Sequence, residues 1–527
     1  MTRTTQQSPL DRLPVWLLAL LALALGGLLA LALMATASGQ VGLADSRLTN
    51  IVLPLAAAGC LIALSLYSPL AGFLAWIALA PYSQHIALDL RLGAGIPDLS
   101  LSRMLGAFLL LLVITRAALG RRKLRPLAWS DLAYALFLFG LVLSVPQTVY
   151  GKLEGLQTIL DAYIVPFIAL FVARQVVRNQ RDLRWLTIVL VASGVAFSLL
   201  IIREQLTGEV LLYAREAARY SRSFQKVISL MGNAAPIGVT TAMVLPLGLT
   251  LLVQSLQADS SATPSRRLGQ LALAAGLAIC AMGVYMTYNR ASWLGLAVSL
   301  VVLLVLRPRM RRLLLPLLLL AGALALVFWQ TVVNSPAVTE RLLEDDSVGY
   351  RTTVLRLALE MSADSPIFGR GYNNFGSIAR RTYGWNPNLL FGVDPPAHNS
   401  YTFFLVSGGL VALLPYLAWM ALLAWQGVQR YRASTSSMTR DALAAGAAVA
   451  LTYFLASGTF DNLNHLAMNL FFYAIIGSIL GATERTLPST PTPTHPRPLT
   501  PTLPRPLTPT HPGPGNKTAG EAEDEKE

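Results

Sequence analysis

Long apolar runs, separated by short charged segments, recur along almost the whole chain. Each run has about 20 residues, which is enough to cross the ~30 Å hydrocarbon core of a bilayer as an α-helix. Inside lipid the backbone must satisfy its own hydrogen bonds, so such runs form helices. The pattern predicts an all-α polytopic membrane protein with about 12–14 transmembrane helices. The approximate cores of the predicted spans are 14–37, 49–66, 69–86, 99–118, 129–149, 156–173, 185–205, 234–256, 269–287, 290–306, 313–333, 399–426, 441–458 and 465–482.

The composition agrees with a membrane protein. Hydrophobic residues make up 54% of the chain and charged residues 13%, which is about half of the ~25% that soluble domains carry. The formal net charge of +14 lies mostly in short loops between spans, so it does not indicate a nucleic-acid partner. Cys60 and Cys280 both lie inside apolar runs and give no metal-ligand spacing.

Lysine and arginine are concentrated in alternate loops, and this bias predicts the orientation of the chain. The cation-rich loops contain Arg121, Arg122, Lys123, Arg125, Arg174, Arg178, Arg181, Arg184, Arg266, Arg267, Arg307, Arg309, Arg311, Arg312, Arg430, Arg432 and Arg440. We assign these loops to the cytoplasm, which places both termini there. The transmembrane domain is predicted to span 1–486. The Pro/Thr-rich segment 487–527 is predicted to be a disordered cytoplasmic tail, because proline removes backbone donors and fixes φ.

Two connections are long, and both fall on the outer side: 207–233 and 334–397. Long connections between elements are often functional. The second precedes the third-last span, and its sequence predicts a helix from Val348 to Ala363, with Tyr350 and Met361 on the apolar face and Arg351 among the polar positions. Aromatic side chains follow that helix and either stack on sugar faces or pack the loop: Tyr372, Phe375, Tyr383, Trp385 and Phe391.

Cations on the outer side are scarce, and they are the candidate binding residues. Arg290 begins a span in "NRASWLGLAVSL", where it either anchors the helix end to lipid phosphates or clamps a phosphate in a site. Lys226 and Arg222 lie in the loop 207–233, which forms either an amphipathic helix on the headgroups or a second wall of an anion site. His398 opens the third-last span, next to Asn399.

Three stretches resemble the family of O-antigen ligases and Wzy-type O-antigen polymerases. The first is "HNSYTFFLVSGG", in which His398 and Asn399 are followed after nine residues by Gly409. The second is "NRASWLGLAVSL", and the third is "YRTTVLRLALEMSADSPIFGRGYNNF". They cover about a quarter of the chain. One departure is that Lys226 stands where the family usually has an arginine, so that either Lys226 or Arg222 supplies the second phosphate-binding cation.

The resemblance implies a metal-independent, inverting glycosyltransferase without a cofactor. It would transfer a glycan from an undecaprenyl-diphosphate carrier to an acceptor hydroxyl on the outer face of the cytoplasmic membrane. His398 would be the catalytic base, since histidine titrates near neutral pH. Arg290 with Lys226 or Arg222 would bind the diphosphate, and Asn399 and Arg351 would support the site.

Two alternatives to the ligase interpretation remain. A Wzy-type polymerase would use the same donor but would extend a lipid-linked glycan; the acceptor is a glycan, a lipid or a protein. A flippase or transporter of lipid-linked glycans belongs to another class and typically carries ionisable groups in the middle of its spans. Such charges are few here, and the cations gather near one membrane surface.

Overall fold

The structure is a computed structural model that describes residues 58–82, 89–90, 99–149, 151–211, 227, 230–257, 264–330, 334, 346–385, 397–458 and 465–484. The contacts between Cα atoms divide the chain into two units, Met1–Leu487 and Pro488–Glu527. The predicted first span (14–37), the tail (487–527), Lys226 and Arg222 lie outside the described residues. The transmembrane domain and the disordered tail therefore stay predictions.

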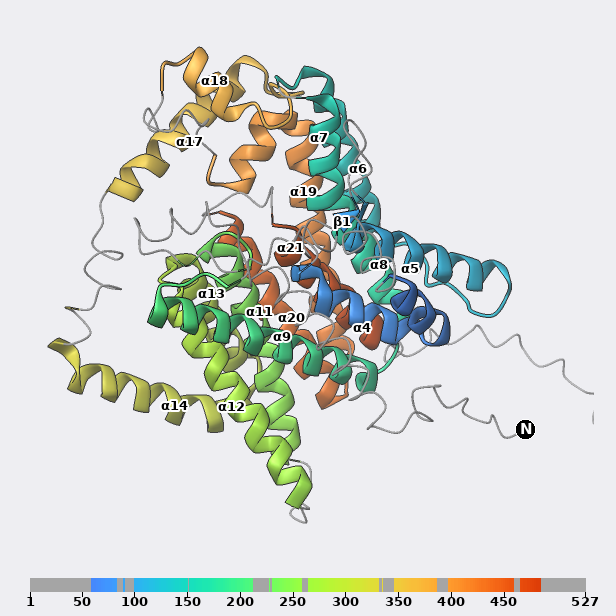
Figure 1. The fold of residues 1–527 in the computed structure, drawn as a ribbon, viewed down its shortest axis with the longest axis vertical. Coiled ribbons are helices and arrows are strands. Elements are labelled where there is room, and N and C mark those ends of the chain that lie inside the picture. Colours follow the sequence, from blue (N-terminus) through green and yellow to red (C-terminus); the bar gives the residue numbers. More distant parts are fainter. Residues whose placement is uncertain are drawn as a thin grey trace, which may run out of the picture. The chain divides into compact units, whose positions relative to one another are not determined.

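Helices make up almost all of the described chain (Figure 1). Among the described residues, eight segments are long and apolar enough to cross a membrane. They are α5 (Leu101–Ala118), α6 (Trp129–Ser144) with η4 (Val145–Gln147), α7 (Lys152–Ile159) with the π-helix η5 (Leu160–Ile164) and α8 (Val165–Val176), α9 (Gln180–Thr207), α11 (Ala234–Gln257), α12 (Pro264–Met286), α19 (Ser400–Ala433) and α21 (Leu466–Thr483).

The other described elements are shorter, less apolar or placed in loops. They are a helix at Ala58–Tyr67, α4 (Pro69–Leu79), η2 (Ala80–Tyr82), α13 (Arg290–Leu306), α14 (Pro308–Val327), α17 (Asp346–Asp364), α18 (Phe375–Arg381) and α20 (Ser437–Ser457). Two strands of two residues each, β1 (Asp89–Leu90) and β2 (Leu99–Ser100), pair antiparallel. The predictions for 49–66 and 69–86 correspond to two short helices that meet at Ser68.

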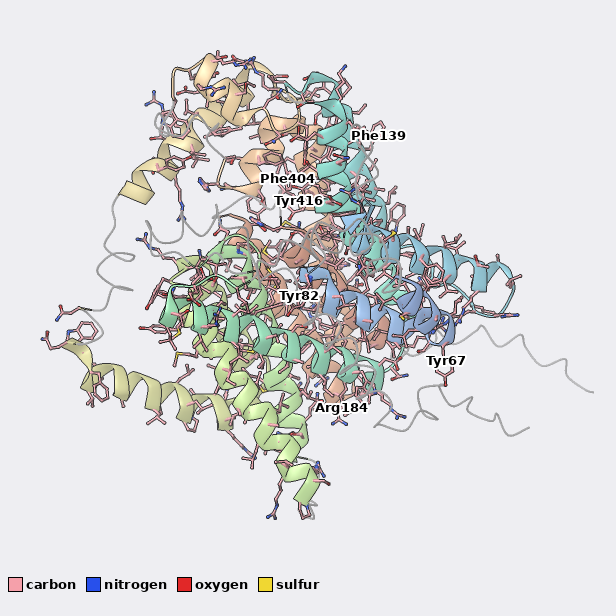
Figure 2. The ribbon with its side chains drawn as sticks, viewed as in Figure 1. Tyr67, Tyr82, Phe139, Arg184, Phe404 and Tyr416 are labelled. Carbon is pink, nitrogen blue, oxygen red and sulfur yellow. The ribbon has the colours of Figure 1, made fainter. Side chains whose placement is uncertain are left out.

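Large apolar side chains remain exposed on many of these helices. Tyr67 is 49% exposed, Phe139 58% and Leu319 73%, and the first two project outward in Figure 2. Water would make such a surface unfavourable, whereas hydrocarbon accepts it. The long apolar helices and this surface confirm the predicted all-α polytopic membrane protein.

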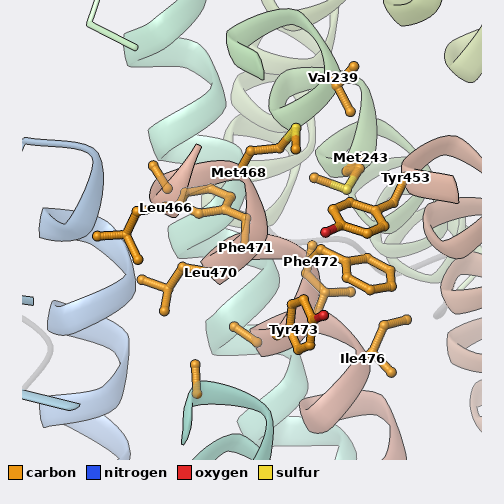
Figure 3. Packing of buried hydrophobic residues seen from close by; sticks show 14 of the residues in the cluster. Val239, Met243, Tyr453, Leu466, Met468, Leu470, Phe471, Phe472, Tyr473 and Ile476 are labelled. Atoms are coloured by element: carbon orange, nitrogen blue, oxygen red, sulfur yellow. The ribbon is translucent and has the colours of Figure 1, made fainter. Parts of the chain in front are cut away.

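Helix α21 lies at the centre of the packed core. Every residue from Leu466 to Thr483 is buried, as expected for a helix that is apolar on all sides. α8, α20, α11 and α9 surround it. Figure 3 shows Tyr453 of α20 against Phe472; the two rings stack with their centroids 3.8 Å apart.

One polar side chain in this core explains the π-helix η5. Asn469 of α21 is fully buried, and its Nδ2 donates to the carbonyl oxygen of Ala162 in η5 at 2.8 Å. The Tyr453 hydroxyl donates to Asn469 Oδ1 at 2.8 Å. A π-turn departs from the regular i−4 bonding, which leaves a carbonyl available to a side chain of another helix. The buried amide is thereby satisfied and ties η5, α20 and α21 together.

Candidate active site

His398 lies two residues before Ser400, the first residue of α19, and its backbone is unusual. Its φ is +46°, a left-handed conformation that few residues other than glycine adopt. The next residue, Asn399, caps the helix: its Oδ1 accepts from the backbone N–H of Tyr401 at 2.9 Å and of Thr402 at 3.3 Å. The cap satisfies two amides of the first turn. It also fixes the point at which the chain enters the helix, and so the direction of the half-buried imidazole of His398.

The neighbour of His398 is an aromatic side chain from the long connection between α14 and α19. The Tyr350 ring meets the imidazole edge-to-face, with centroids 5.3 Å apart. Tyr350 belongs to α17, which packs against α19 (Figure 1). On the same helix Val354 and Met361 are buried, which confirms the predicted apolar face. Arg351 follows Tyr350 directly and is therefore carried to the same region as the imidazole.

Arg290 is the first residue of α13, and the two residues before it repeat the arrangement of His398 and Asn399 before α19. Asn289 caps α13 by accepting the backbone N–H of Ser292 at 2.9 Å, and Tyr288 before it has a φ of +48°. The arginine is thus the first residue of its helix, where the amides of the first turn and the helix dipole favour an anion.

Arg290 and Arg351 lie close enough to interact. Burial around the guanidinium of Arg351, and then the positive charge of Arg290, lower the pKa of Arg351. The residue as a whole stays exposed. Two guanidiniums of like charge repel each other, and an anion bound between them removes the repulsion. Arg290 and Arg351 are therefore candidates for one anion site, and Tyr350, the residue before Arg351, contacts His398.

Helix α19 is broken ten residues after Asn399, a feature that its uniformly apolar sequence does not reveal. Gly409 has a φ of +63° and a ψ of −158°, which is not a helical conformation. The segment 366–374, here called the strap, pairs with the break. Its backbone makes four hydrogen bonds to α19: Arg370 N–H to Val406 O at 2.7 Å, Gly371 N–H to Ser407 O at 3.1 Å, Leu410 N–H to Pro366 O at 2.9 Å and Val411 N–H to Ile367 O at 3.1 Å.

The strap gives the broken helix the hydrogen bonds that it loses. A break in a transmembrane helix exposes carbonyls and amides that lipid cannot satisfy, and the strap supplies partners on both sides of Gly409. The rings of Phe404 and Tyr416 pack across the break with centroids 4.7 Å apart (Figure 2). The strap therefore joins the end of α17 firmly to the helix that His398 precedes.

Asn374 holds the other side of the strap. Its side chain is buried; Oδ1 accepts from Val149 N–H at 2.8 Å, and Nδ2 donates to Gln147 O at 2.8 Å and to Arg370 O at 2.7 Å. The Tyr372 N–H also donates to Ser144 O at 3.1 Å. These bonds connect the strap to the segment that follows α6, so that two separate segments share one buried amide.

Replacing Asn374 with alanine is expected to lower the free energy of unfolding by about 2–3 kcal/mol, because two carbonyls and one amide lose their partner. The matched control is Asn373→Gly, which removes the neighbouring exposed amide side chain at a φ of +57°. Thermal unfolding of the purified protein in detergent should show a large decrease for the first variant and little change for the second. Equal decreases would contradict this role of Asn374.

Comparison with known proteins supports the same region. Residues 275–417 match a family model described as O-antigen ligase. This range contains Arg290, Arg351, the strap, His398 and the break at Gly409. No curated protein matches the chain. The match confirms the predicted family and supports glycan transfer of the ligase or polymerase type.

Sequence reasoning missed Tyr350 as the neighbour of His398, the break in α19 and the role of Asn374.

Proposed function

We propose that this chain, which carries the O-antigen ligase domain in residues 275–417, transfers a glycan from undecaprenyl diphosphate to an acceptor hydroxyl. The observation that supports this function is the convergence of three segments. The positive charge of Arg290 contributes to the lowered pKa of Arg351, and Tyr350, adjacent to Arg351, contacts the imidazole of His398. An anion site next to a base is the combination that displacement of a diphosphate requires.

In the proposed reaction His398 acts as the general base. Its unprotonated ring nitrogen takes the proton of the acceptor hydroxyl while the oxygen forms a bond to the anomeric carbon of the donor sugar. The bond from that carbon to the diphosphate oxygen breaks, and undecaprenyl diphosphate leaves with the electron pair. A single displacement of this kind inverts the anomeric configuration. Arg290 and Arg351 stabilise the negative charge that grows on the leaving group.

The remaining predicted site residues have supporting roles in this proposal. Asn399 fixes the entry of α19 and thereby positions His398. Lys226 or Arg222 supplies a further cation for the second phosphate, and both lie outside the described residues. Lysine would act there as a point charge, whereas arginine would bind two phosphate oxygens at once.

The proposed orientation places this site on the outer face of the bacterial cytoplasmic membrane. The support is the concentration of lysine and arginine in the alternate loops that do not contain Arg290 or His398. Both termini then lie in the cytoplasm. In this position the site meets a lipid-linked donor at the interface, where its diphosphate lies.

A flippase or transporter of lipid-linked glycans is the alternative from another class, and the break in α19 is a feature that transporters also use. Here the strap occupies the break with its own backbone. Asp161, one of the few acidic residues within a span, forms a bidentate pair with Arg103 at 2.5 and 2.6 Å. In both places the groups that a transporter would use are already bonded within the protein. The helices therefore form a fixed scaffold, which favours an enzyme over a flippase or transporter.

Replacing Arg290 with glutamine is expected to slow glycan transfer by roughly tenfold to a hundredfold, because one fixed cation no longer stabilises the leaving diphosphate. Arg432→Gln, at the other end of α19, is the matched control. Lipid-linked and finished surface glycans would be profiled in the native cell at equal membrane levels of each variant.

The outcomes of this experiment separate the candidate functions. Undecaprenyl-linked glycan that accumulates on the outer face supports a transferase, and the chain length of the finished glycan then distinguishes a ligase from a polymerase. Accumulation on the cytoplasmic face would identify a flippase. An unchanged glycan profile in Arg290→Gln would contradict the proposed site.

A further inference from the structure

We infer that Tyr350 and Trp385 form a binding platform for a sugar ring of the acceptor, next to His398. This inference rests on the proposed function and narrows it, because it makes the acceptor a glycan. The two aromatic side chains come from different parts of the connection between α14 and α19, and the structure places them together at the one histidine that opens α19.

The platform is continuous with the proposed base. The Tyr350 ring contacts both Trp385 and His398, with centroid distances of 5.2 Å to Trp385 and 5.3 Å to His398. Tyr350 and Trp385 are half-buried, so each keeps part of its ring accessible. The apolar face of a pyranose packs on such rings through its C–H groups, and this places a rim hydroxyl within reach of the imidazole.

Other aromatic residues of this connection have a different role. Tyr372 and Phe375 are almost fully buried, at 0% and 2% exposed. The Phe375 ring meets the Trp385 ring edge-to-face at 6.5 Å and supports it from below. The backbone N–H of Trp385 donates to Ala379 O at 2.9 Å, and Gly384 turns the chain with a φ of +64°. The backbone that carries the indole is therefore fixed, which lowers the entropy lost when a sugar binds.

Polar groups lie at the opposite end of α17 from Tyr350. The Tyr383 hydroxyl, two residues before Trp385, lies 3.3 Å from an Asp364 carboxylate oxygen, to which Arg370 also donates. The Asp364 side chain is still 56% exposed. Burial around the ring and the charge of Asp364 raise the pKa of Tyr383, so its hydroxyl stays a proton donor. Asp364 lies about 21 Å along α17 from Tyr350, at 1.5 Å per residue, so these polar groups are not part of the platform.

The test compares Trp385→Ala and Trp385→Phe with wild type in liposomes that contain the full chain. The donor is the undecaprenyl-linked glycan that accumulates in cells carrying His398→Ala, and the acceptor is the surface-glycan fraction from the same cells. Trp385→Ala is expected to raise the KM for the acceptor by roughly tenfold through loss of the stacking contact. The KM for the donor should stay unchanged, and Trp385→Phe should restore most of the acceptor affinity. Trp425→Ala, which removes a 59% exposed indole from α19, should leave both constants as in wild type.

Each result has a distinct meaning. If His398→Ala accumulates no donor, the proposed function is wrong and the platform is wrong with it. If His398→Ala blocks transfer but Trp385→Ala leaves the acceptor KM unchanged, only the platform is wrong. A lower kcat in Trp385→Ala with an unchanged acceptor KM would show that the indole merely supports the loop, which also overturns the inference.

Discussion

Replacing His398 with alanine is expected to lower the rate of glycan transfer by about 10²- to 10⁴-fold, the contribution that a positioned general base typically makes. The donor diphosphate leaves readily, but the acceptor hydroxyl needs a base to remove its proton. The expected effect therefore falls on kcat and leaves the KM for the donor largely unchanged. Single-turnover transfer from the extracted lipid-linked donor would measure it.

A chemical readout distinguishes a base from a structural histidine. Imidazole added to the His398→Ala variant should restore part of the activity, because the free base can occupy the space beside Tyr350. The matched control is His465→Gln, since His465 also stands directly before a helix, α21. Transfer should persist in that control. Full activity in His398→Ala, or a loss that is as large in His465→Gln, would remove His398 from the proposed mechanism.

The helices could be predicted from local patterns because each apolar run by itself predicts one helix. The runs at 99–118, 234–256 and 465–482 correspond closely to α5, α11 and α21. The caps follow a local rule as well, although we did not predict them: Asn289 and Asn399 stand directly before their helices, and asparagine is a preferred N-cap. The predicted helix at 348–363 is α17. Helices and their caps depend on residues that are close together in the sequence, so a single sequence is enough to predict them.

The site was only partly predictable, since its contacts join distant segments. His398 and Arg290 were identified as the histidine and the cation that open two spans. The contact between Tyr350 and His398 depends on how the long connection folds back onto α19, and no local pattern reports that. The break at Gly409 was hidden for a similar reason. An apolar run looks continuous, although the strap supplies partners that permit a break within it.

Among the residues where the strap meets α19, Gly409 should tolerate substitution least. Its φ of +63° and ψ of −158° lie in a region that is essentially restricted to glycine. A Cβ atom added there would lie 2.2 Å from the Ile367 carbonyl oxygen and 2.6 Å from the Gly369 amide nitrogen. Both are backbone atoms whose positions are fixed by the four hydrogen bonds between the strap and α19. No side-chain rotation can relieve these contacts, so either the strap or the helix must move.

Gly409→Ala is therefore expected to lower the free energy of unfolding by about 4 kcal/mol or more, which combines backbone strain with overpacking. Gly427→Ala is the matched control: it lies in the same helix, and no atom stands within 4 Å of its added Cβ. That control should be neutral or slightly stabilising, because alanine favours a helix over glycine. Unfolding in detergent, followed by thermal denaturation and limited proteolysis near residues 366–374, would measure both. Equal stability of the two variants would show that the strap can pair with α19 without the break at Gly409. Gly409 would then have no role in holding α17 beside His398.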